Sequence, residues 1–376
     1  MRRFIANFFV TILLISSALI SSSAFSSQVL KVGPGQEFVL PSIAAQFAMK
    51  GDVIEIDASG EYLNDFVIWK QDNLIIRGVN GRPHIISTIN SPNKKAIWVV
   101  KGDGISISNV EMSGAKVKHK NGAAIRLAGK NFTLSDCYIH DNQNGILSGK
   151  NKKSEVLIDD CEFAFNGYGK GQTHNIYIGK VDRLTIKNSY IHNANIGHNI
   201  KSRAKENYIL YNRIFEGKSS YAIDISNGGY SLIMGNIIYQ GDLTENSAMI
   251  ALGMEGGRVN SRLEFVFNSV LNERNAGSFI KSKGKIEALI ANNIFDGRGR
   301  VLDGGLNYRD NYYGMGVFEE FSAREVTVKK ELFHYVVDKG VKVNAELVPG
   351  FHAQENSLQK RIEKGKAFDM GAIEYN

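Results

Sequence analysis

Short apolar segments joined by polar corners recur along the central part of the chain. Between residues 51 and 310 the spacing of apolar positions is almost never helical. Instead, a short β-rich strand of three to five residues precedes an Asn or Asp, and a second short apolar strand follows it. Eight such corners, separated by 27, 24, 28, 24, 24, 32 and 25 residues, are Asn109, Asp136, Asp160, Asn188, Asn212, Asn236, Asn268 and Asn293.

A period near 24 residues, with strands this short, predicts a parallel β-solenoid that has three strands per coil. Stacked coils pair strand on strand at about 4.7–4.9 Å, so equivalent residues of successive coils lie directly above one another. An Asn at the same corner of each coil fits this fold. Its backbone tolerates the left-handed conformation, and its amide can bond to the next amide in the stack.

With these repeats the chain resembles the right-handed parallel β-helix superfamily of pectate lyases, over roughly residues 51–313. The segment "PSIAAQFAMKGDVIEIDASGEY" is similar to the helix-then-strand opening of secreted polysaccharide lyases of the alginate lyase and chondroitinase B type. We therefore expect an all-β, single-domain right-handed parallel β-helix at 51–313, an N-terminal cap with a short helix at 25–50, and a C-terminal cap at 314–376. The last segment, "AFDMGAIEYN", resembles the closing strand of secreted β-helix proteins.

The first residues have the three-part layout of a secretory signal peptide. Arg2 and Arg3 are followed by an apolar run from Phe4 to Ile20 and then by small residues. We expect cleavage after Ala24, so that residues 1–24 are removed. No later segment approaches membrane-spanning length. The prediction is a secreted or periplasmic protein that has no membrane span once the signal peptide is removed.

The charge of the chain indicates its class of partner. The net charge of +7 includes two charges from Arg2 and Arg3, which leaves +5 on the mature chain. This excess suits an acidic polysaccharide. The lysine-rich segments 116–120 and 149–155 are expected to be exposed turns, at most the rim of a polyanion groove. A nucleic-acid partner is not expected, because the sequence has neither zinc-finger spacing nor a nucleotide-binding glycine loop. We expect a monomer.

The chain has two cysteines, Cys137 and Cys161, which occupy the same place in adjacent coils. Their Cα atoms are expected to lie about 5 Å apart, which is within the range for a disulfide. A disulfide and a stacked pair of free thiols both fit the sequence.

Alignment of the coils makes "THNIYIG", "GHNIKSR" and "SYAIDIS" successive strands of one sheet. Ile176, Ile200 and Ile223 then form an inward stack, and strand alternation turns their neighbours outward. The outward face is predicted to carry a patch about three coils tall, roughly 10–15 Å. Its members are Tyr177, Lys201, Asp224, Asn175, Asn199 and Arg203, with His174, His198 and Tyr221 at the strand starts, Arg126 below and Glu255 above.

These residue types suit β-elimination of a uronic-acid polymer. In that reaction a base removes the proton beside the carboxylate, a cation neutralises the carboxylate, and an acid assists the leaving oxygen. Lys201 is the expected base, with a pKa lowered by Arg203 and by desolvation under the sugar. Arg203 is expected to clamp the carboxylate. His198 and His174 are alternative bases. Asp224 supports the site, but its charge works against the lowering of the Lys201 pKa unless it binds a cation.

The substrate-binding residues expected around this centre are Tyr177, Tyr221, Asn175, Asn199, Arg126 and Glu255, of which the tyrosines would stack on a sugar ring or donate a proton. The resemblance to the alginate lyase and chondroitinase B group implies a Lys and an Arg on successive coils, beside calcium held by acidic and amide groups. Here Lys201 and Arg203 share a coil, which departs from that pattern. Asn199, Asp224 and Glu255 are candidate calcium ligands, and no other cofactor is expected.

Other interpretations fit the same sequence. A uronate epimerase shares the fold and the first half of the chemistry. A glycoside hydrolase on this fold would use two or three carboxylates, and such groups are few on the outward face. A non-catalytic matrix protein could bind polysaccharide through its basic face. His174 and His198 also fit a ladder produced by the repeat, and Lys201 and Arg203 also fit a solvated strand face.

Overall fold

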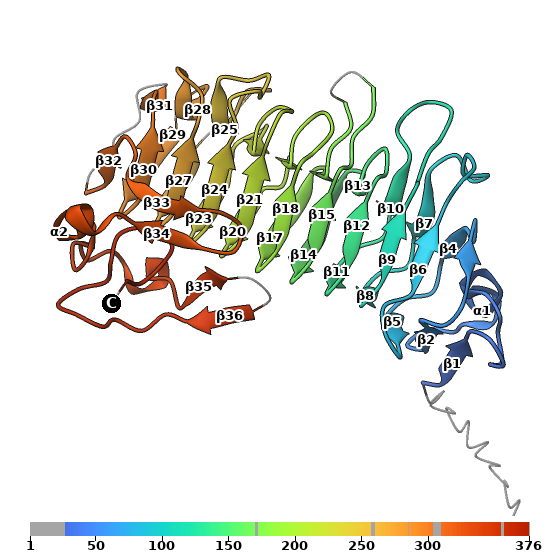
Figure 1. The fold of residues 1–376 in the computed structure, drawn as a ribbon. Coiled ribbons are helices and arrows are strands. Elements are labelled where there is room, and N and C mark those ends of the chain that lie inside the picture. The colour runs from blue at the N-terminus through green and yellow to red at the C-terminus, as the bar shows by residue number, and fades with distance from the viewer. Residues whose placement is uncertain are drawn as a thin grey trace, which may run out of the picture.

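The computed structural model describes residues 27–169, 172–256, 260–284, 286–303, 310–354 and 357–375, so the expected signal peptide at 1–24 lies outside the described residues. Within them, strands form three long parallel sheets that wind around one apolar core, and helices are few (Figure 1). Each complete coil contributes one strand to each sheet, and we name the sheets A, B and C in the order in which the chain reaches them. The prediction of an all-β parallel β-helix with three strands per coil is confirmed.

The strands of the three sheets are short and follow one another at coil intervals. Sheet A consists of β1 (Val29–Val32), β2 (Val53–Asp57), β5 (Ile75–Val79), β8 (Ser106–Ser108), β11 (Phe132–Ser135), β14 (Asn151–Asp159), β17 (Val181–Lys187), β20 (Glu206–Leu210), β23 (Tyr230–Met234), β26 (Ser261–Val266) and β29 (Ile286–Ala291). Sheet B consists of β3 (Tyr62–Leu63), β6 (His84–Ile86), β9 (Glu111–Ser113), β12 (Tyr138–His140), β15 (Glu162–Ala164), β18 (Tyr190–His192), β21 (Arg213–Glu216), β24 (Ile237–Gln240), β27 (Ser269–Asn272), β30 (Ile294–Gly297) and β32 (Tyr312–Gly314). Sheet C consists of β4 (Val67–Trp69), β7 (Ala96–Val100), β10 (Ala123–Leu127), β13 (Ile146–Ser148), β16 (Ile176–Ile178), β19 (Ile200–Ser202), β22 (Ile223–Ile225), β25 (Ala248–Leu252), β28 (Ser278–Ser282) and β31 (Arg300–Asp303).

Aliphatic side chains stacked from coil to coil make up the core. In sheet C, Ile176 pairs with Ile200 and Ile200 with Ile223, and all three side chains are fully buried. Burial of each such side chain contributes about 1.5–3 kcal/mol. Because side chains alternate across a strand, this inward stack fixes which residues face outward between its members. The predicted isoleucine stack is confirmed, and it sets the register of the outward face.

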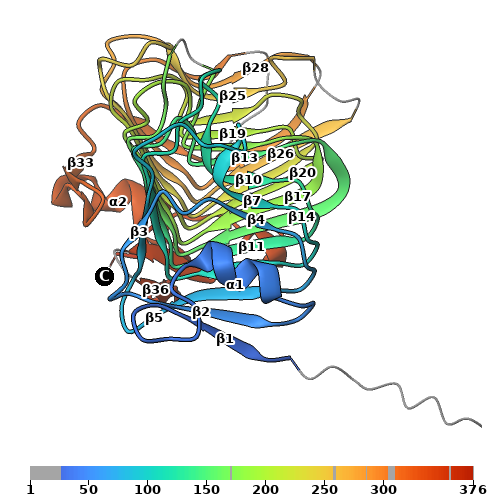
Figure 2. The same ribbon diagram turned by 90° about the vertical axis from the view of Figure 1, so that its right-hand side faces the viewer.

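A short helix covers the N-terminal end of the solenoid. Helix α1 (Pro41–Phe47) begins with a proline, and its Ala44 is fully buried. Figure 2 shows α1 lying across the open end, in front of the strands. The expected cap helix is therefore present, and it shields backbone and core that an open solenoid end exposes. Sheet A begins earlier than expected, because β1 precedes the helix and pairs in parallel with β2.

The C-terminal segment lies along the flank of the later coils (Figure 1). It contains two antiparallel hairpins, β33 (Phe318–Phe321) with β34 (Val326–Val328) and β35 (Phe351–Gln354) with β36 (Ser357–Lys360). It also contains the helical turns η1 (Lys330–Leu332), α2 (Phe333–Val336) and η2 (Ala345–Leu347). Val336 and Ala372 pack in one cluster with Phe267 of the solenoid.

The prediction that "AFDMGAIEYN" forms a closing strand is wrong, because residues 367–375 form no strand. Instead, the buried guanidinium of Arg361 holds this segment in place. It donates hydrogen bonds to the Glu374 carboxylate and to the carbonyl oxygens of Gly371 and Asp369. Among the described residues, no helix combines the length and the apolar character needed to span a membrane.

The eight polar corners do not form a single column, contrary to the prediction. Asn109, Asp136, Asp160 and Asn188 adopt left-handed backbone with φ near +50°. In later coils the residue before the corner, such as Tyr211 or Phe267, takes that conformation instead. The following asparagines then turn inward, fully buried, and donate amide to amide up the stack: Asn212, Asn236, Asn268 and Asn293.

We call this stack of hydrogen-bonded asparagine side chains the asparagine ladder, and the loss of one of its amides should destabilise the whole solenoid. Asn236 donates through Nδ2 to Asn268 Oδ1 at 3.0 Å, and its Oδ1 accepts from the backbone N–H of Asn212 at 2.8 Å and from Asn212 Nδ2 at 3.1 Å. In Asn236→Ala these buried partners lose their hydrogen bonds, so we expect a loss of about 1–3 kcal/mol in the free energy of unfolding. Denaturant titration measures it. The exposed Asn275→Ala should change the free energy of unfolding by less than about 0.5 kcal/mol, and equal effects would contradict the role of the ladder.

Candidate active site

The outward face of sheet C carries the column that the sequence predicted. Tyr177 pairs in register with Lys201, and Lys201 with Asp224. Below them, Arg126 pairs with Leu147 and Leu147 with Tyr177. The parallel pairing stacks these side chains at the strand spacing, so that groups far apart in sequence meet on one face. The predicted order of these residues is confirmed by the strand register.

Four charged side chains form a compact cluster in this column. The Lys201 ammonium contacts Asp224 Oδ2 at 2.7 Å and Glu255 Oε1 at 3.0 Å. Arg203 donates from Nε and Nη2 to the two oxygens of Glu255, both at 2.7 Å. The Lys201 side chain is only 12% exposed and that of Asp224 4%, whereas Glu255 is 38% exposed. Glu255 therefore forms the outer edge of the cluster, where a ligand can reach it.

The ion pairs determine the charge states of the cluster. Burial by itself lowers the pKa of Lys201, but the charges and hydrogen bonds of Asp224 and Glu255 outweigh it and raise that pKa above its ordinary value. The expectation of a lowered Lys201 pKa is wrong for the free protein. Its physical reason is that two carboxylates contact the ammonium, whereas Arg203 is itself neutralised by Glu255. Burial alone would raise the pKa of Glu255, but hydrogen bonds from Arg203 and Lys201 lower it.

Arg203 also borders a large hollow on this face. Its guanidinium lies over the ring of Tyr177, 5.0 Å from the ring centroid. The hollow has a volume of about 830 Å³, and Arg203, Tyr177 and Arg126 contribute to its wall. The Lys120 ammonium lies 5.6 Å from the ring centroid of the exposed Tyr168, which also lines the hollow. We call this feature the cationic hollow.

The charged residues in the wall of the cationic hollow are all basic. Among the described residues that line it none is acidic, and the five cationic side chains are Lys120, Arg126, Lys150, Lys180 and Arg203. Lys120 and Lys150 belong to the lysine-rich segments that the sequence predicted as exposed turns. Lys180 was missed, because a lone lysine at the end of a strand carries no signal in the sequence. Only the winding of the coils brings these charges around one space.

The two histidines of the predicted site form a backbone ladder. His174 Nδ1 accepts the backbone N–H of His198 at 3.0 Å, and His198 Nδ1 accepts the backbone N–H of Tyr221 at 3.3 Å. The rings stack with centroids 4.8 Å apart. Burial lowers the pKa of His198 to about 4, and burial together with nearby cations lowers that of His174 as well. Their role as alternative bases is therefore wrong, since the acceptor nitrogen of each neutral ring is already occupied.

The asparagines beside these histidines point inward, not toward substrate. Asn175 and Asn199 are fully buried, and Asn175 Nδ2 donates to Asn199 Oδ1 at 2.6 Å. Strand alternation does not hold there, because both residues precede the first residue of β16 and of β19 and lie in the bend. The prediction that they face outward and bind substrate is wrong.

The candidate calcium ligands do not fit a calcium ion. The side-chain oxygen of Asn199 is occupied within the core, where it accepts from Asn175. The Lys201 ammonium stands between Asp224 and Glu255, in the place where a cation would have to sit. Calcium needs six to eight oxygen ligands, and this set offers two carboxylates that are already neutralised.

Two further predictions concern Tyr221 and the cysteines. Tyr221 is half-buried, with its ring 5.1 Å from that of His198, and it is not among the residues that line the cationic hollow. Cys137 and Cys161 are both buried and unlinked, each donating to a backbone carbonyl two residues earlier. Burial, together with the neighbouring Cys137, raises the pKa of the Cys161 thiol. Of the two arrangements left open by the sequence, the structure shows the pair of free thiols.

Comparison with known proteins agrees with this architecture. The chain matches no protein-family model. A probable pectin lyase F of Aspergillus flavus and one of Aspergillus oryzae are each 27% identical to it, over 46% of this chain and 38% of the relative's length. Pectate lyase Pel9A superposes with a TM-score of 0.52 at 13% identity, over 94% of this chain and 98% of that chain. ORF18 of Geobacillus virus E2 gives a TM-score of 0.50 at 14% identity, over 77% and 60%. The chain therefore has the pectate-lyase-like parallel β-helix fold.

Proposed function

We propose that this protein is an exported lyase that cleaves an acidic, uronate-containing polysaccharide by β-elimination. The observation that carries the proposal is the cationic hollow, in which five basic side chains and two tyrosines surround a space beside the charged cluster. Such a field concentrates a polyanion, and tyrosine rings offer flat apolar faces to sugar rings. The similarity to relatives named as pectin lyases supports a uronate polymer as substrate. Export rests on the predicted signal peptide.

Arg203 is the proposed clamp for the carboxylate of the reacting uronate. In the free protein Arg203 already binds the Glu255 carboxylate through two parallel hydrogen bonds. A substrate carboxylate would compete with Glu255 for the same guanidinium fork. Tyr177 lies beneath the guanidinium and holds it against the sheet, and Arg126 lies two coils below. Neutralising the carboxylate makes the adjacent C5 proton acidic enough to remove.

Lys201 is the proposed base. Its ammonium lies next to Tyr177 in the strand register and shares Glu255 with Arg203, so displacement of Glu255 by substrate would remove one of its two anionic partners. Asp224 would stay in contact with the Lys201 amine at 2.7 Å and orient it, because the Asp224 side chain is buried and is not displaced. Loss of one carboxylate partner favours the neutral amine, which is the form that accepts a proton.

Replacing Glu255 by glutamine should move the pH dependence of turnover. In the unchanged protein the Lys201 pKa is raised, so the neutral amine becomes populated only as the pH rises through that value, and we expect turnover to increase into alkaline pH. Glu255→Gln removes one negative charge and lowers the Lys201 pKa, so the increase should move to lower pH. The pH profile of kcat/KM, which reports the pKa of the free protein, where Glu255 still contacts Lys201, measures this shift.

The matched control for this substitution is Glu206→Gln. Glu206 pairs with Arg183 at 3.0 Å on sheet A, away from the cluster. Its profile should coincide with that of the unchanged protein. A Glu255→Gln profile that moves to higher pH would contradict Lys201 as the base.

Ultraviolet absorbance tests the reaction type directly. The mature protein is incubated with polygalacturonate, alginate and glycosaminoglycans, since β-elimination creates a conjugated unsaturated uronate that absorbs. Rising absorbance with shortening chains is the expected result. Chains that shorten without absorbance would indicate hydrolysis. Intact chains that exchange the C5 proton with solvent would indicate an epimerase, and intact chains without exchange would favour the binding protein.

The charge states favour elimination over hydrolysis. A glycoside hydrolase of the two-carboxylate type needs one carboxyl group protonated, as the general acid. Hydrogen bonds from Arg203 and Lys201 overcome the effect of burial and lower the pKa of Glu255, which keeps it ionised at neutral pH. Asp224 is held at 2.7 Å by an ammonium. Both carboxylates are thus arranged as partners of cations.

A further inference from the structure

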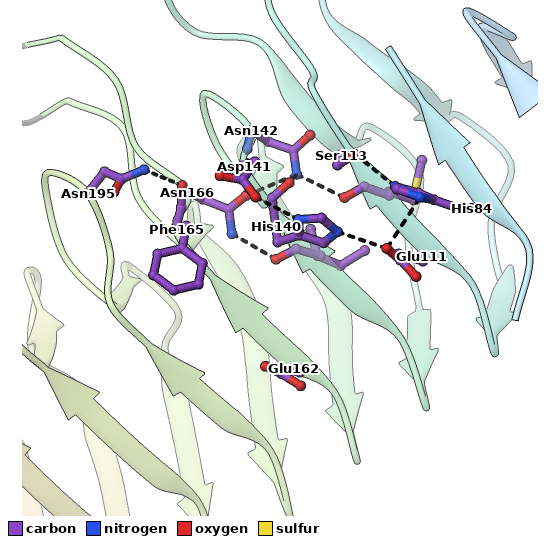
Figure 3. Close-up of polar contacts among 12 residues, drawn as sticks. His84, Glu111, Ser113, His140, Asp141, Asn142, Glu162, Phe165, Asn166 and Asn195 are labelled. Carbon is purple, nitrogen blue, oxygen red and sulfur yellow. Dashed lines mark hydrogen bonds and ion pairs between the residues drawn. The ribbon is translucent and has the colours of Figure 1, made fainter. Parts of the chain in front are cut away.

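A second cluster of reactive side chains lies on the outward face of sheet B. His84 of β6, Glu111 of β9 and His140 of β12 come from three successive coils, and Figure 3 shows them pointing toward one another. One ligand atom of each lies within 4.8 Å of the others. None of the three lines the cationic hollow or contacts the Lys201 cluster, so the proposed lyase chemistry makes no use of them.

The distances within this cluster approach those of a metal site. Glu111 Oε1 lies 3.3 Å from His84 Nδ1 and 3.0 Å from His140 Nε2. Zinc bound tetrahedrally at about 2.0–2.2 Å from nitrogen and oxygen sets its ligands roughly 3.3 Å apart. Two of the three edges therefore already match, and the third, between the two histidine nitrogens, is at most 4.8 Å, which a rotation of the His84 imidazole can shorten. The side chains are 15–32% exposed, which leaves a path for an ion.

The second nitrogen of each imidazole is also engaged. His84 Nε2 lies 2.8 Å from Ser113 Oγ, and His140 Nδ1 lies 2.7 Å from Asp141 Oδ2. Zinc-binding histidines commonly hydrogen-bond through the nitrogen that does not bind the metal, most often to a carboxylate or another oxygen. The Tyr138 ring stacks on His140 at 4.2 Å and limits its rotation. The nitrogens that face Glu111 are thus kept toward the centre of the cluster.

The repeat supplies an internal comparison two coils further on. His192 Nε2 lies 3.0 Å from Glu162 Oε1, and Tyr190 stacks on His192 at 3.9 Å, as Tyr138 does on His140. The register partner of Glu162 in the preceding coil is Tyr138, however, whereas that of Glu111 is His84. At Glu162 and His192 the repeat therefore supplies one histidine and one carboxylate, without a counterpart of His84. A stacked Tyr with a His–Glu pair belongs to the repeat, and the added His84 is what distinguishes the first location.

We propose that His84, Glu111 and His140 bind a zinc ion through His84 Nδ1, Glu111 Oε1 and His140 Nε2, with water as the fourth ligand. Imidazole nitrogen with one carboxylate oxygen is a donor set that suits zinc and is poor for calcium. The ion links three successive coils near the N-terminal end of the solenoid. Because it binds the folded chain alone, it raises the stability of that end.

The proposal is tested by measuring zinc binding to the mature chain. The protein is prepared without a histidine tag and stripped of metal with a chelator. Isothermal titration with zinc chloride should show a single ion bound per chain, and thermal unfolding should shift to higher temperature with zinc but not with calcium. His84→Ala and His140→Ala should each lose both effects. Asp141→Asn, which alters only the support of His140, should weaken binding by about 10–100-fold. His192→Ala is the matched control and should bind like the unchanged protein.

Each result has a defined meaning because the side chains of His84, Glu111 and His140 are partly exposed, so their replacement should leave the fold intact. Circular dichroism verifies that the variants fold, and Glu111→Gln, which keeps the shape of the side chain, serves where an alanine variant does not. Absence of zinc binding by the unchanged chain would overturn the proposal and leave the cluster as two histidines paired with Glu111. Binding that survives in both His84→Ala and His140→Ala, or that His192→Ala abolishes, would overturn it too.

Discussion

Lys201→Arg is expected to reduce turnover of the acidic polysaccharide by about 10²–10⁴-fold, the range that a positioned general base contributes. Arginine keeps the positive charge between Asp224 and Glu255, so the cluster stays neutralised, but it cannot act as a base near neutral pH. Substrate affinity should change little, because the cationic hollow is intact. Initial rates of absorbance increase give kcat, and binding to the uncleaved polymer gives the affinity.

The arginine variant is more informative than alanine at this position. Lys201→Ala would leave the Asp224 carboxylate, whose side chain is 4% exposed, without its main counter-charge and would destabilise the fold. Lys187→Arg is the matched control, since Lys187 pairs with Asp159 at 2.9 Å on the outward face of sheet A. It should retain full turnover. Turnover by Lys201→Arg close to that of the unchanged protein would exclude Lys201 as the base.

Arg203→Ala is expected to lower kcat by about 10²–10³-fold, the effect of removing one preorganised group that stabilises developing negative charge. The alanine leaves the carboxylate of the reacting uronate without its clamp, so the C5 proton becomes less acidic. KM should rise as well, because Arg203 is one of five cations around the hollow. The same absorbance assay, run over a range of substrate concentrations, separates the two effects.

Arg213→Ala is a close structural control for this variant. The Arg213 guanidinium lies over the Tyr190 ring at 4.9 Å, as that of Arg203 lies over Tyr177 at 5.0 Å, but on sheet B. It should leave kcat and KM unchanged, although it also loses its bond to the Ala323 carbonyl oxygen. Equal losses in the two variants would mean that the cation–aromatic contact matters for stability and not for turnover.

Much of the outward face could be predicted, because register in a solenoid follows from the repeat. Aligning Ile176, Ile200 and Ile223 was enough to stack Tyr177, Lys201 and Asp224, and the strand pairing has that order. The prediction failed at the bends. Asn175 and His174 precede the strand, where side chains do not alternate between the two faces. Their directions are instead set by hydrogen bonds to buried backbone groups, the His192 carbonyl oxygen and the backbone N–H of His198.

The charge states of the site could not be predicted for a related reason. Glu255 lies 52 residues after Arg203 in sequence, yet its carboxylate reaches both Arg203 and Lys201. Whether a lysine has a raised or a lowered pKa depends on the balance between burial and such contacts. That balance is a property of distances of a few ångströms, which a repeat pattern does not contain.

The sequence by itself determined the parallel solenoid, the length of its coils, the inward stack and the column of Tyr177, Lys201 and Asp224. These features follow from the period of the apolar residues. Side chains alternate between the two faces of a strand, and each coil returns the chain to the same sheet, so equivalent residues stack. Tertiary structure alone decided the gathering of Lys120, Lys150 and Lys180 around one hollow, the double ion pair of Lys201, and the meeting of His84 with His140. Lys120, Lys150, Lys180 and Glu255 lie in the connections between strands, whose lengths do not share the period of the strands. His84 and His140 lie on strands two coils apart, and their meeting depends on the directions of their side chains.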